Sequence, residues 1–212
     1  MLSGGGDDRV LAWDIGKAEK EKNTLFEIKE GFKDSIEYIK FNHDGKYLLI
    51  TGQGNPIRIY KVIDGDDESQ FEFKKEMETG EDINFITWHQ KSNFFLTGGK
   101  DMMVWMFNAL TGEFTTYTGH EDEINNAEFT PAGKRIVSIS NDCTAKVWDP
   151  VSTKCLMTIK DEKSFHQHPI TAMFMINESM ISGDSEGYIY ISQIKTGESV
   201  GPVTKHAENV EC

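Results

Sequence analysis

The sequence predicts an all-β fold built from four-stranded antiparallel units that repeat along the chain. Three observations support this fold class. The chain contains a repeat with a period of about 40 to 45 residues, it has alternating polar and apolar stretches that are typical of half-buried strands, and it lacks a long amphipathic helical pattern. Glycine and proline turn signals separate the alternating stretches, as expected for hairpins.

The repeat is clearest around Trp148. The segment from Asp142 to Asp149 begins with an acidic turn residue, continues as an alternating strand and ends in Trp-Asp. Four other segments fit the same frame: Asp7 to Asp14, Gly54 to Lys61, Asp101 to Asn108 and Glu186 to Gln193. The steps between their Trp-equivalent positions are 47, 47, 41 and 44 residues, which is the spacing of four-stranded propeller blades.

The start of each blade is marked 28 residues before the Trp-equivalent position, by Gly119-His120 and by Gly31-Phe32. Alternating first strands follow, at Ile124 to Phe129 and at Ile36 to Phe41. The apolar runs that come next suit second strands buried on both faces: Tyr47 to Ile50, Phe94 to Leu96 and Ile136 to Ile139.

The repeat also predicts the division of the chain. Residues 1–30 are expected to form half a blade, residues 31–78, 79–117, 118–162 and 163–203 four blades, and residues 204–212 the start of another. Because a closed ring needs roughly four to eight blades, residues 1–212 are predicted to be a partial β-propeller, about half of a seven- or eight-bladed ring and thus a fragment. The charged segment Lys17 to Lys22 lacks an apolar face, so it is predicted to be a solvated hairpin loop.

Four side chains in the repeat that ends at Trp148 stand at the spacing of a buried hydrogen-bond network: His120, Ser138, Asp142 and Trp148. A buried tryptophan and histidine need partners for their polar atoms, and a hydroxyl between them can serve both. Serine, histidine and aspartate also form hydrolytic triads, but a nucleophile needs an exposed hydroxyl in a pocket. The network is therefore predicted to be structural, and no catalytic residue is expected.

Incomplete versions of this network occur in other repeats. They consist of Ser3, Asp7 and Trp13, of Thr97 and Asp101, and of Ser182 and Glu186. Where Tyr60, Phe107 and Ser192 replace the tryptophan, the network is expected to be looser and the blade less stable.

No metal or cofactor site is predicted. Gly4-Gly5-Gly6 precedes a strand and not the helix that a phosphate-binding loop needs. His166-Gln167-His168 has too few ligands for zinc, and His166 holds the blade-start histidine position. Cys143, Cys155 and Cys212 are too far apart for a disulfide framework or a metal cluster, which favours a reducing compartment.

The chain carries 35 acidic and 22 basic residues, a formal charge of −13. Such a charge repels phosphate backbones and anionic lipid, so neither nucleic acid nor membrane is an expected direct partner, and no small-molecule substrate is expected. It attracts basic protein segments, although it is also typical of soluble proteins in general. A signal-peptide pattern is missing and no apolar run approaches about 18 residues. A soluble cytoplasmic protein is therefore expected.

Acidic residues at the blade starts are the candidate partner-binding residues. Blade-start loops open on one face of a propeller, and this places Asp34, Asp82, Glu121, Asp122 and Glu123 on one rim. Asp101 and Asp142 lie near that rim but are expected to be used in turns and in the buried network. The acidic run Asp64 to Glu68 lies on the opposite face and is the alternative site.

Several stretches resemble one branch of the WD-repeat family: Ser3 to Arg9, Ile86-Thr87-Trp88-His89, Met103 to Phe107 and Phe165 to Ile170. This is the family of angio-associated migratory cell protein and its fungal counterpart, a dedicated chaperone of a basic large-subunit ribosomal protein. The resemblance implies a β-propeller that shields a basic ribosomal segment through an acidic face during large-subunit assembly. A generic WD-repeat scaffold in a signalling, trafficking or cytoskeletal complex is the alternative, and the sequence does not separate the two.

Overall fold

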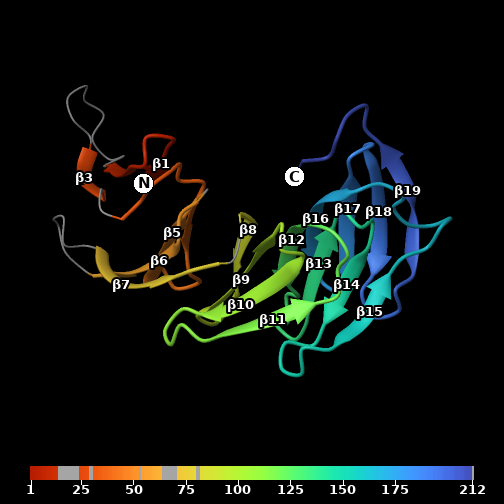
Figure 1. Ribbon diagram of the computed structural model, residues 1–212. Helices are drawn as coiled ribbons and strands as arrows, with labels where there is room; N and C mark the ends of the chain where they lie inside the picture. The colour runs from red at the N-terminus through yellow and green to blue at the C-terminus, as the bar shows by residue number, and fades with distance from the viewer. Residues whose placement is uncertain (14–23, 29–30, 53, 64–70, 80–81, 212) are drawn as a thin grey trace. The chain divides into compact units, whose positions relative to one another are not determined.

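The computed structural model describes residues 1–13, 24–28, 31–52, 54–63, 71–79 and 82–211 (Figure 1). The regular elements in these ranges are all β-strands, and each sheet is antiparallel. No helix in the described ranges is long and apolar enough to cross a membrane. The chain separates into two compact units, Met1–Asp82 and Ile83–Cys212.

The first unit holds two sheets. A three-stranded sheet contains β1 (Leu2–Gly4), β2 (Val10–Trp13) and β3 (Thr24–Ile28) in that order. A four-stranded sheet contains β4 (Tyr38–Phe41), β5 (Tyr47–Thr51), β6 (Ile57–Val62) and β7 (Phe71–Met77). Residues 1–30 thus form three strands, one more than half of a four-stranded blade.

The core of the first unit lies between these two sheets. Val10 of β2 packs with Leu48 and Ile50 of β5, and none of the three has exposed surface. The residues of β5 from Leu48 to Thr51 are all buried. Since successive residues of a strand point to opposite faces of the sheet, this burial explains the apolar run without alternation.

The second unit holds three four-stranded sheets (Figure 1). The first contains β8 (Ile83–Trp88), β9 (Phe94–Gly99), β10 (Met103–Asn108) and β11 (Phe114–Thr118). The second contains β12 (Ile124–Phe129), β13 (Ile136–Ser140), β14 (Ala145–Trp148) and β15 (Cys155–Ile159). The third contains β16 (Ile170–Ile176), β17 (Ser179–Asp184), β18 (Tyr188–Gln193) and β19 (Ser199–Lys205). The predicted all-β fold of four-stranded antiparallel blades is confirmed.

The three sheets of the second unit pack face to face in chain order. One buried cluster joins Leu96 and Val104 of the first sheet to Ile136 and Trp148 of the second. Another cluster joins the second sheet to the third. Since the middle sheet is covered on both sides, every residue of its strand β13 is buried.

The loops of each blade lie at the two ends of its strands, and these ends are called the upper and lower edge. The upper edge is the end where the first strand begins, and the lower edge is the end where that strand finishes. For β12, Glu121 to Glu123 precede the strand at the upper edge, and the turn Pro131 to Gly133 follows it at the lower edge. A strand of six residues separates the two edges by about 20 Å.

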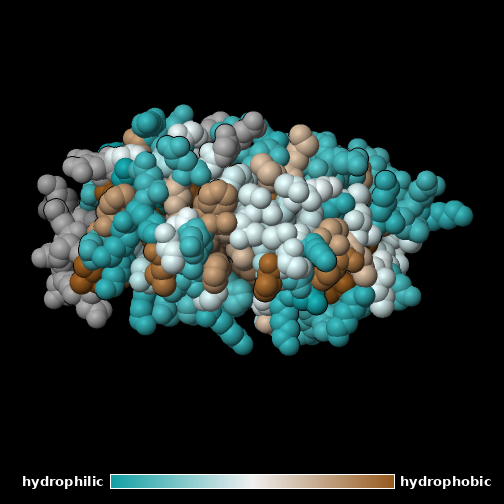
Figure 2. Space-filling model, turned by 60° about the horizontal axis from the view of Figure 1, so that its bottom comes forward, coloured by the Kyte–Doolittle hydropathy of each residue, from teal (hydrophilic) through white to brown (hydrophobic). Residues whose placement is uncertain are grey.

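Hydrophobic residues also reach the surface. Figure 2 shows brown hydrophobic residues scattered among teal hydrophilic ones on the face that it presents. In the last sheet, Phe174, Ile181, Ile191 and Val200 are paired in register across the four strands and so lie in one row. Phe174 is 62% exposed and Val200 is 69% exposed. One face of this sheet is thus partly open.

Candidate functional site

A chain of hydrogen bonds crosses the blade formed by β12 to β15. His120 Nδ1 donates to Asp142 Oδ2 at 2.7 Å, because a carboxylate can only accept. His120 Nε2 then accepts from the Ser138 hydroxyl at 2.8 Å, and that hydroxyl accepts from Trp148 Nε1, also at 2.8 Å. The four side chains proposed from spacing are thus brought together in one network.

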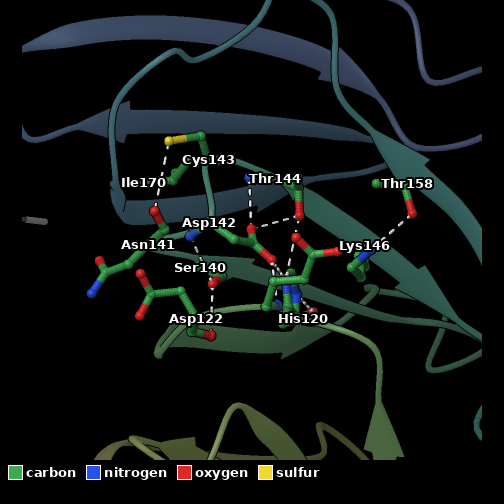
Figure 3. A network of polar contacts seen from close by, with 12 residues as sticks. His120, Asp122, Ser140, Asn141, Asp142, Cys143, Thr144, Lys146, Thr158 and Ile170 are labelled. Carbon is green, nitrogen blue, oxygen red and sulfur yellow. Dashed lines mark hydrogen bonds and ion pairs between the residues drawn. The ribbon is translucent and has the colours of Figure 1, made fainter.

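Asp142 also holds the loops of the upper edge (Figure 3). Its carboxylate accepts from the Thr144 backbone N–H at 2.9 Å, the Thr144 hydroxyl at 2.7 Å and the Glu121 backbone N–H at 3.0 Å. Burial alone would raise the pKa of Asp142, but the hydrogen bonds from His120, Thr144 and Glu121 outweigh it and lower the pKa well below its usual range. Asp142 therefore stays charged and fixes the Glu121 backbone.

This constellation is not arranged for nucleophilic catalysis. Ser138 has no exposed surface, and its oxygen is engaged by both His120 and Trp148. A hydroxyl in this position cannot approach a substrate carbonyl, which a nucleophilic serine must do. The network instead satisfies the polar atoms of a tryptophan that is 1% exposed.

The last blade repeats part of the network with a different carboxylate. His166 Nδ1 donates to Asp184 Oδ2 at 2.7 Å, and His166 Nε2 accepts from the Ser182 hydroxyl at 2.8 Å. The expectation that Glu186 supplies the carboxylate is wrong, since Glu186 is exposed and Asp184 lies at the end of β17, two residues after Ser182. Burial lowers the pKa of His166 despite the neighbouring Asp184 carboxylate. The imidazole is therefore neutral.

No indole completes the network of the last blade. Ser192 holds the tryptophan position, and its hydroxyl pairs with that of Ser199 at 2.7 Å. The ring of Tyr190 packs edge-on against His166 with 4.3 Å between ring centroids. Ser182 therefore serves one ring nitrogen, where Ser138 serves two.

The two other incomplete networks differ from expectation. Trp13 Nε1 donates to Ser3 at 2.7 Å, but Asp7 takes no part and pairs with Arg9 at 3.6 Å. Asp101 accepts from Trp105 Nε1 at 2.6 Å and does not contact Thr97. In the described part of the chain the buried hydroxyl of Thr97 has no hydrogen-bond partner. The blade β8–β11 thus lacks the network.

The sequence pattern did not predict a set of side-chain hydrogen bonds that join the first strand of a blade to the chain segment after that blade. Asn84 Nδ2 donates to the Ile124 carbonyl at 3.0 Å, and Asn125 Nδ2 donates to the Ile170 carbonyl at 2.7 Å. Thr171 Oγ1 donates to the Val210 carbonyl at 2.5 Å. A signal was present, because each donor is the second residue of its blade's first strand and follows an isoleucine.

Of the five acidic candidates, the structure brings three together, at the upper edge of β12. Glu121 and Asp122 are exposed, and Asp122 Oδ1 accepts from the Glu123 backbone N–H at 2.7 Å. Glu123 is half-buried, and its carboxylate accepts from Asn84 Nδ2 at 2.8 Å. Glu123 thus helps to join two blades, whereas Glu121 is open to a partner.

The remaining acidic candidates lie in the first unit or outside the described residues. Asp34 is exposed, and its carboxylate accepts from the Ser35 backbone N–H at 2.7 Å. Asp82 is the last residue of the first unit. The alternative cluster Asp64 to Glu68 falls outside the described residues, as does the segment Lys17 to Lys22.

The family model "WD domain, G-beta repeat" matches residues 71–108 and 112–149. This chain contains WD repeats. The second match ends on Trp148-Asp149, so a WD repeat in sequence covers the outer strand of one blade and the three inner strands of the next. WD-repeat proteins act as scaffolds for protein interactions.

The chain is also similar to several curated proteins. Human angio-associated migratory cell protein is 24% identical over 202 residues, which cover 94% of this chain and 44% of that protein. Human serine-threonine kinase receptor-associated protein is 27% identical over 150 residues, covering 70% and 39%. Periodic tryptophan protein 2 of Saccharomyces cerevisiae is 30% identical over 138 residues, covering 61% and 15%. The chain thus spans less than half the length of these relatives.

The computationally designed Ika8 protein has the same fold, with a TM-score of 0.80 and 20% sequence identity. The match covers 99% of this chain and 60% of the designed one.

The WD repeats offer no metal centre in the described ranges, where no group of three or more histidine, cysteine, aspartate or glutamate side chains could hold an ion. His166 is used in the buried network, and His168 stacks on Tyr188 with 6.3 Å between ring centroids.

Proposed function

We propose that this WD-repeat chain is a scaffold that binds a basic segment of a large-subunit ribosomal protein and acts as its chaperone during subunit assembly. The observation that carries the proposal is the pair of exposed carboxylates, Glu121 and Asp122, on an upper edge that Asp142 holds in place. The resemblance to the angio-associated migratory cell protein family supports the choice of ligand. We also propose a cytoplasmic location.

The upper edge of β12 suits a basic partner for two reasons. Its loop is anchored, because the Glu121 backbone donates to Asp142 and the Asp122 carbonyl accepts from the Ser140 hydroxyl at 2.9 Å. An anchored loop loses little conformational entropy on binding. The charge of −13 also attracts a basic segment at long range, which raises the association rate more than the affinity.

The test is a charge change that spares the fold. Glu121→Lys with Asp122→Asn removes the acidic character of the edge, while asparagine keeps an oxygen for the Glu123 backbone N–H. Glu123 is left unchanged because it binds Asn84. The matched control, Glu113→Lys with Glu198→Gln, changes the net charge equally at the lower edge. Binding of a fluorescein-labelled Lys/Arg-rich peptide is measured by stopped flow at several salt concentrations.

We expect the upper-edge variant to bind the peptide several-fold more weakly, mainly through slower association, and with less dependence on salt. Each exposed ion pair contributes only about 0.2–1 kcal/mol, so the loss should be partial. The control should bind like the wild type. Equal losses in both variants would show that only net charge matters, and a loss confined to reversal of Asp64, Asp66, Asp67 and Glu68 would assign the binding to that acidic run.

A second candidate is a scaffold in a signalling complex, which the similarity to serine-threonine kinase receptor-associated protein favours. Affinity capture from cell extract with the wild type and the upper-edge variant, followed by mass spectrometry, separates the two. A ribosomal protein captured by the wild type and lost from the variant supports the chaperone. A receptor kinase or its adaptors, captured equally by both proteins, would support the signalling scaffold.

A further inference from the structure

A cavity of about 370 Å³ lies between the sheets β12–β15 and β16–β19 at their lower edges. Its apolar wall contains Val147 and Met157 of one sheet and Ile194, which follows β18 of the other. Val147 and Ile194 are buried members of the core cluster that joins these sheets, and Met157 packs against it. The wall is therefore part of the blade core. Its volume is at the lower end of the range found for ligand pockets, roughly 300 to 1,000 Å³.

The rim of the cavity is cationic, in contrast to the chain as a whole. Lys134 and Arg135 come from the β12–β13 turn, and Lys195 comes from the neighbouring sheet. One acidic residue, Glu178, lines the cavity with them and pairs with Lys195 at 2.5 Å. Lys134 is exposed and forms no ion pair with the described residues. Glu178 thus pairs with Lys195 and Asp149 pairs with Arg135, but the cations at this edge still outnumber the anions.

Arg135 keeps donors for a ligand. Its Nη1 donates to the Lys134 carbonyl at 2.7 Å and contacts Asp149 Oδ2 at 3.3 Å. The Asp149 carboxylate is shared, because it also accepts from the Val151 and Ser152 backbone N–H groups. A guanidinium has five N–H donors, so most remain available to a second carboxylate.

We infer that this cavity binds an acidic peptide segment, with an apolar side chain of the peptide against Val147, Met157 and Ile194 and its carboxylates on Lys134 and Arg135. A peptide fits better than a small carboxylate because it can place an apolar side chain on the wall and carboxylates on the rim at the same time. Leu156, which also lines the cavity and is 48% exposed, extends the apolar surface to the outside. The site differs in position and in preferred charge from the acidic upper edge.

The test uses the full chain and a fluorescein-labelled peptide, Gly-Asp-Leu-Phe-Asp-Glu-Gly, in an anisotropy titration. Two variants address the two halves of the site. Lys134→Glu with Lys195→Glu reverses the rim charge, and Ala132→Trp fills the cavity from an exposed turn position that lines it. The matched control is Lys160→Glu with Lys163→Glu, two exposed lysines that do not line the cavity. A peptide with Leu-Phe replaced by Ser-Ser needs no change in the protein.

We expect the peptide to bind the wild type saturably. The rim reversal should weaken this binding by about five- to tenfold, and Ala132→Trp should abolish it. The control should bind within twofold of the wild type. The Ser-Ser peptide should not bind, and the Glu121→Lys, Asp122→Asn variant should bind like the wild type, which separates this site from the proposed function. Unchanged binding in both cavity variants, equal binding of the Ser-Ser peptide, or no saturable binding would overturn the inference. Octanoate that competes at the peptide's own concentration would overturn the choice of a peptide.

Discussion

At the scale of single residues, the stability that a buried network gives its blade depends on how many partners its serine has. Ser138 accepts from Trp148 and donates to His120, so its loss leaves two buried polar atoms without a partner. Ser182 serves His166 alone. An unpaired buried polar group costs about 1–3 kcal/mol, so the two serines should differ by about that amount.

We therefore expect Ser138→Ala to lower the free energy of unfolding by about 1–3 kcal/mol more than Ser182→Ala does. Urea denaturation followed by tryptophan fluorescence measures both losses. Ser152→Ala, at an exposed turn position, is the control and should change little. Equal losses for the two buried serines would contradict a role for Ser138 in holding the indole.

The lowered pKa of His166 makes the last blade sensitive to mild acid. The unfolded chain takes up a proton at this histidine near pH 6.5, whereas the folded blade resists protonation. Stability therefore falls as the pH drops below about 6.5. The lowered pKa of Asp142 adds a second loss, which begins only below about pH 4.

Unfolding midpoints in urea at pH 7.5, 6.5 and 5.5 should decline for the wild type, and the decline should be smaller in His166→Asn. His43→Asn, at an exposed turn position, should keep the full decline. If His166→Asn and the wild type lose stability in parallel over this range, protonation of His166 is not the cause.

Residue spacing predicted every member of the complete network but only some members of the incomplete ones, namely Ser3, Trp13 and Ser182. In the blade that ends at Trp148, the spacing of all four side chains matched their contacts. In the last blade, Asp184 and Glu186 both lie near the strand end, and spacing alone cannot tell which carboxylate reaches His166. The Asn84 and Asn125 bridges escaped because their carbonyl partners carry no side-chain signal.

At the scale of strands and turns, close backbone contacts fix the first strand of a blade against its second. Gly52 follows β5, and a Cβ atom there would lie 1.8 Å from the Ser35 carbonyl oxygen. Asn55 secures the same loop, since its side chain donates to the Asp34 carbonyl at 2.7 Å and accepts from the Lys33 backbone N–H at 2.7 Å. The loop before β4 thus has no room for a side chain at Gly52.

Gly52→Ala should destabilise the first unit by about 1–3 kcal/mol, because the clash is with backbone and cannot be relieved by a rotamer change. Gly6→Ala is the control, since a Cβ at Gly6 would lie 3.6 Å from its nearest neighbour, the Ser35 hydroxyl oxygen. Thermal unfolding monitored by circular dichroism compares the two. A Gly52→Ala protein as stable as Gly6→Ala would show that the loop can move aside.

At the scale of the whole molecule, the position of a blade among its neighbours determines how hard it is to open. The blade β12–β15 packs on blades at both of its faces and holds the complete network. The blade β16–β19 has one partly open face, marked by Phe174 and Val200. In repeat proteins stability is roughly a sum of blade and interface contributions, so the middle blade should be the more protected.

Hydrogen exchange followed by mass spectrometry should show slower exchange for the amides of β13 than for those of β17. The amides of β14 and β18, the next strands of the two blades, provide a second matched comparison of exchange rates. Faster exchange in β13 would mean that the interface with β8–β11 opens before the interface with β16–β19.

The repeat period was sufficient to predict the fold class, because steps of 41 to 47 residues between Trp-equivalent positions match a four-stranded blade. It did not predict β1, the additional strand in residues 1–30, because β1 contains only three residues and shows too little alternation to be recognised. The cavity beside Met157 was also beyond prediction, because its walls come from two blades and Met157 and Ile194, which line it, are 37 residues apart in the sequence.

The contacts of Val210 have a mechanical consequence. The Val210 carbonyl accepts from Thr171, and the Val210 N–H donates to the Asp184 carbonyl at 3.2 Å. Nearby, the His206 N–H donates to the Gly187 carbonyl at 2.9 Å. Tension applied to the C-terminal residues would therefore be carried by the β17–β18 hairpin. It would act at Asp184, whose carboxylate binds His166. Pulling on this end of the chain and acidifying the solution would disrupt the same network, one by force and the other by charge.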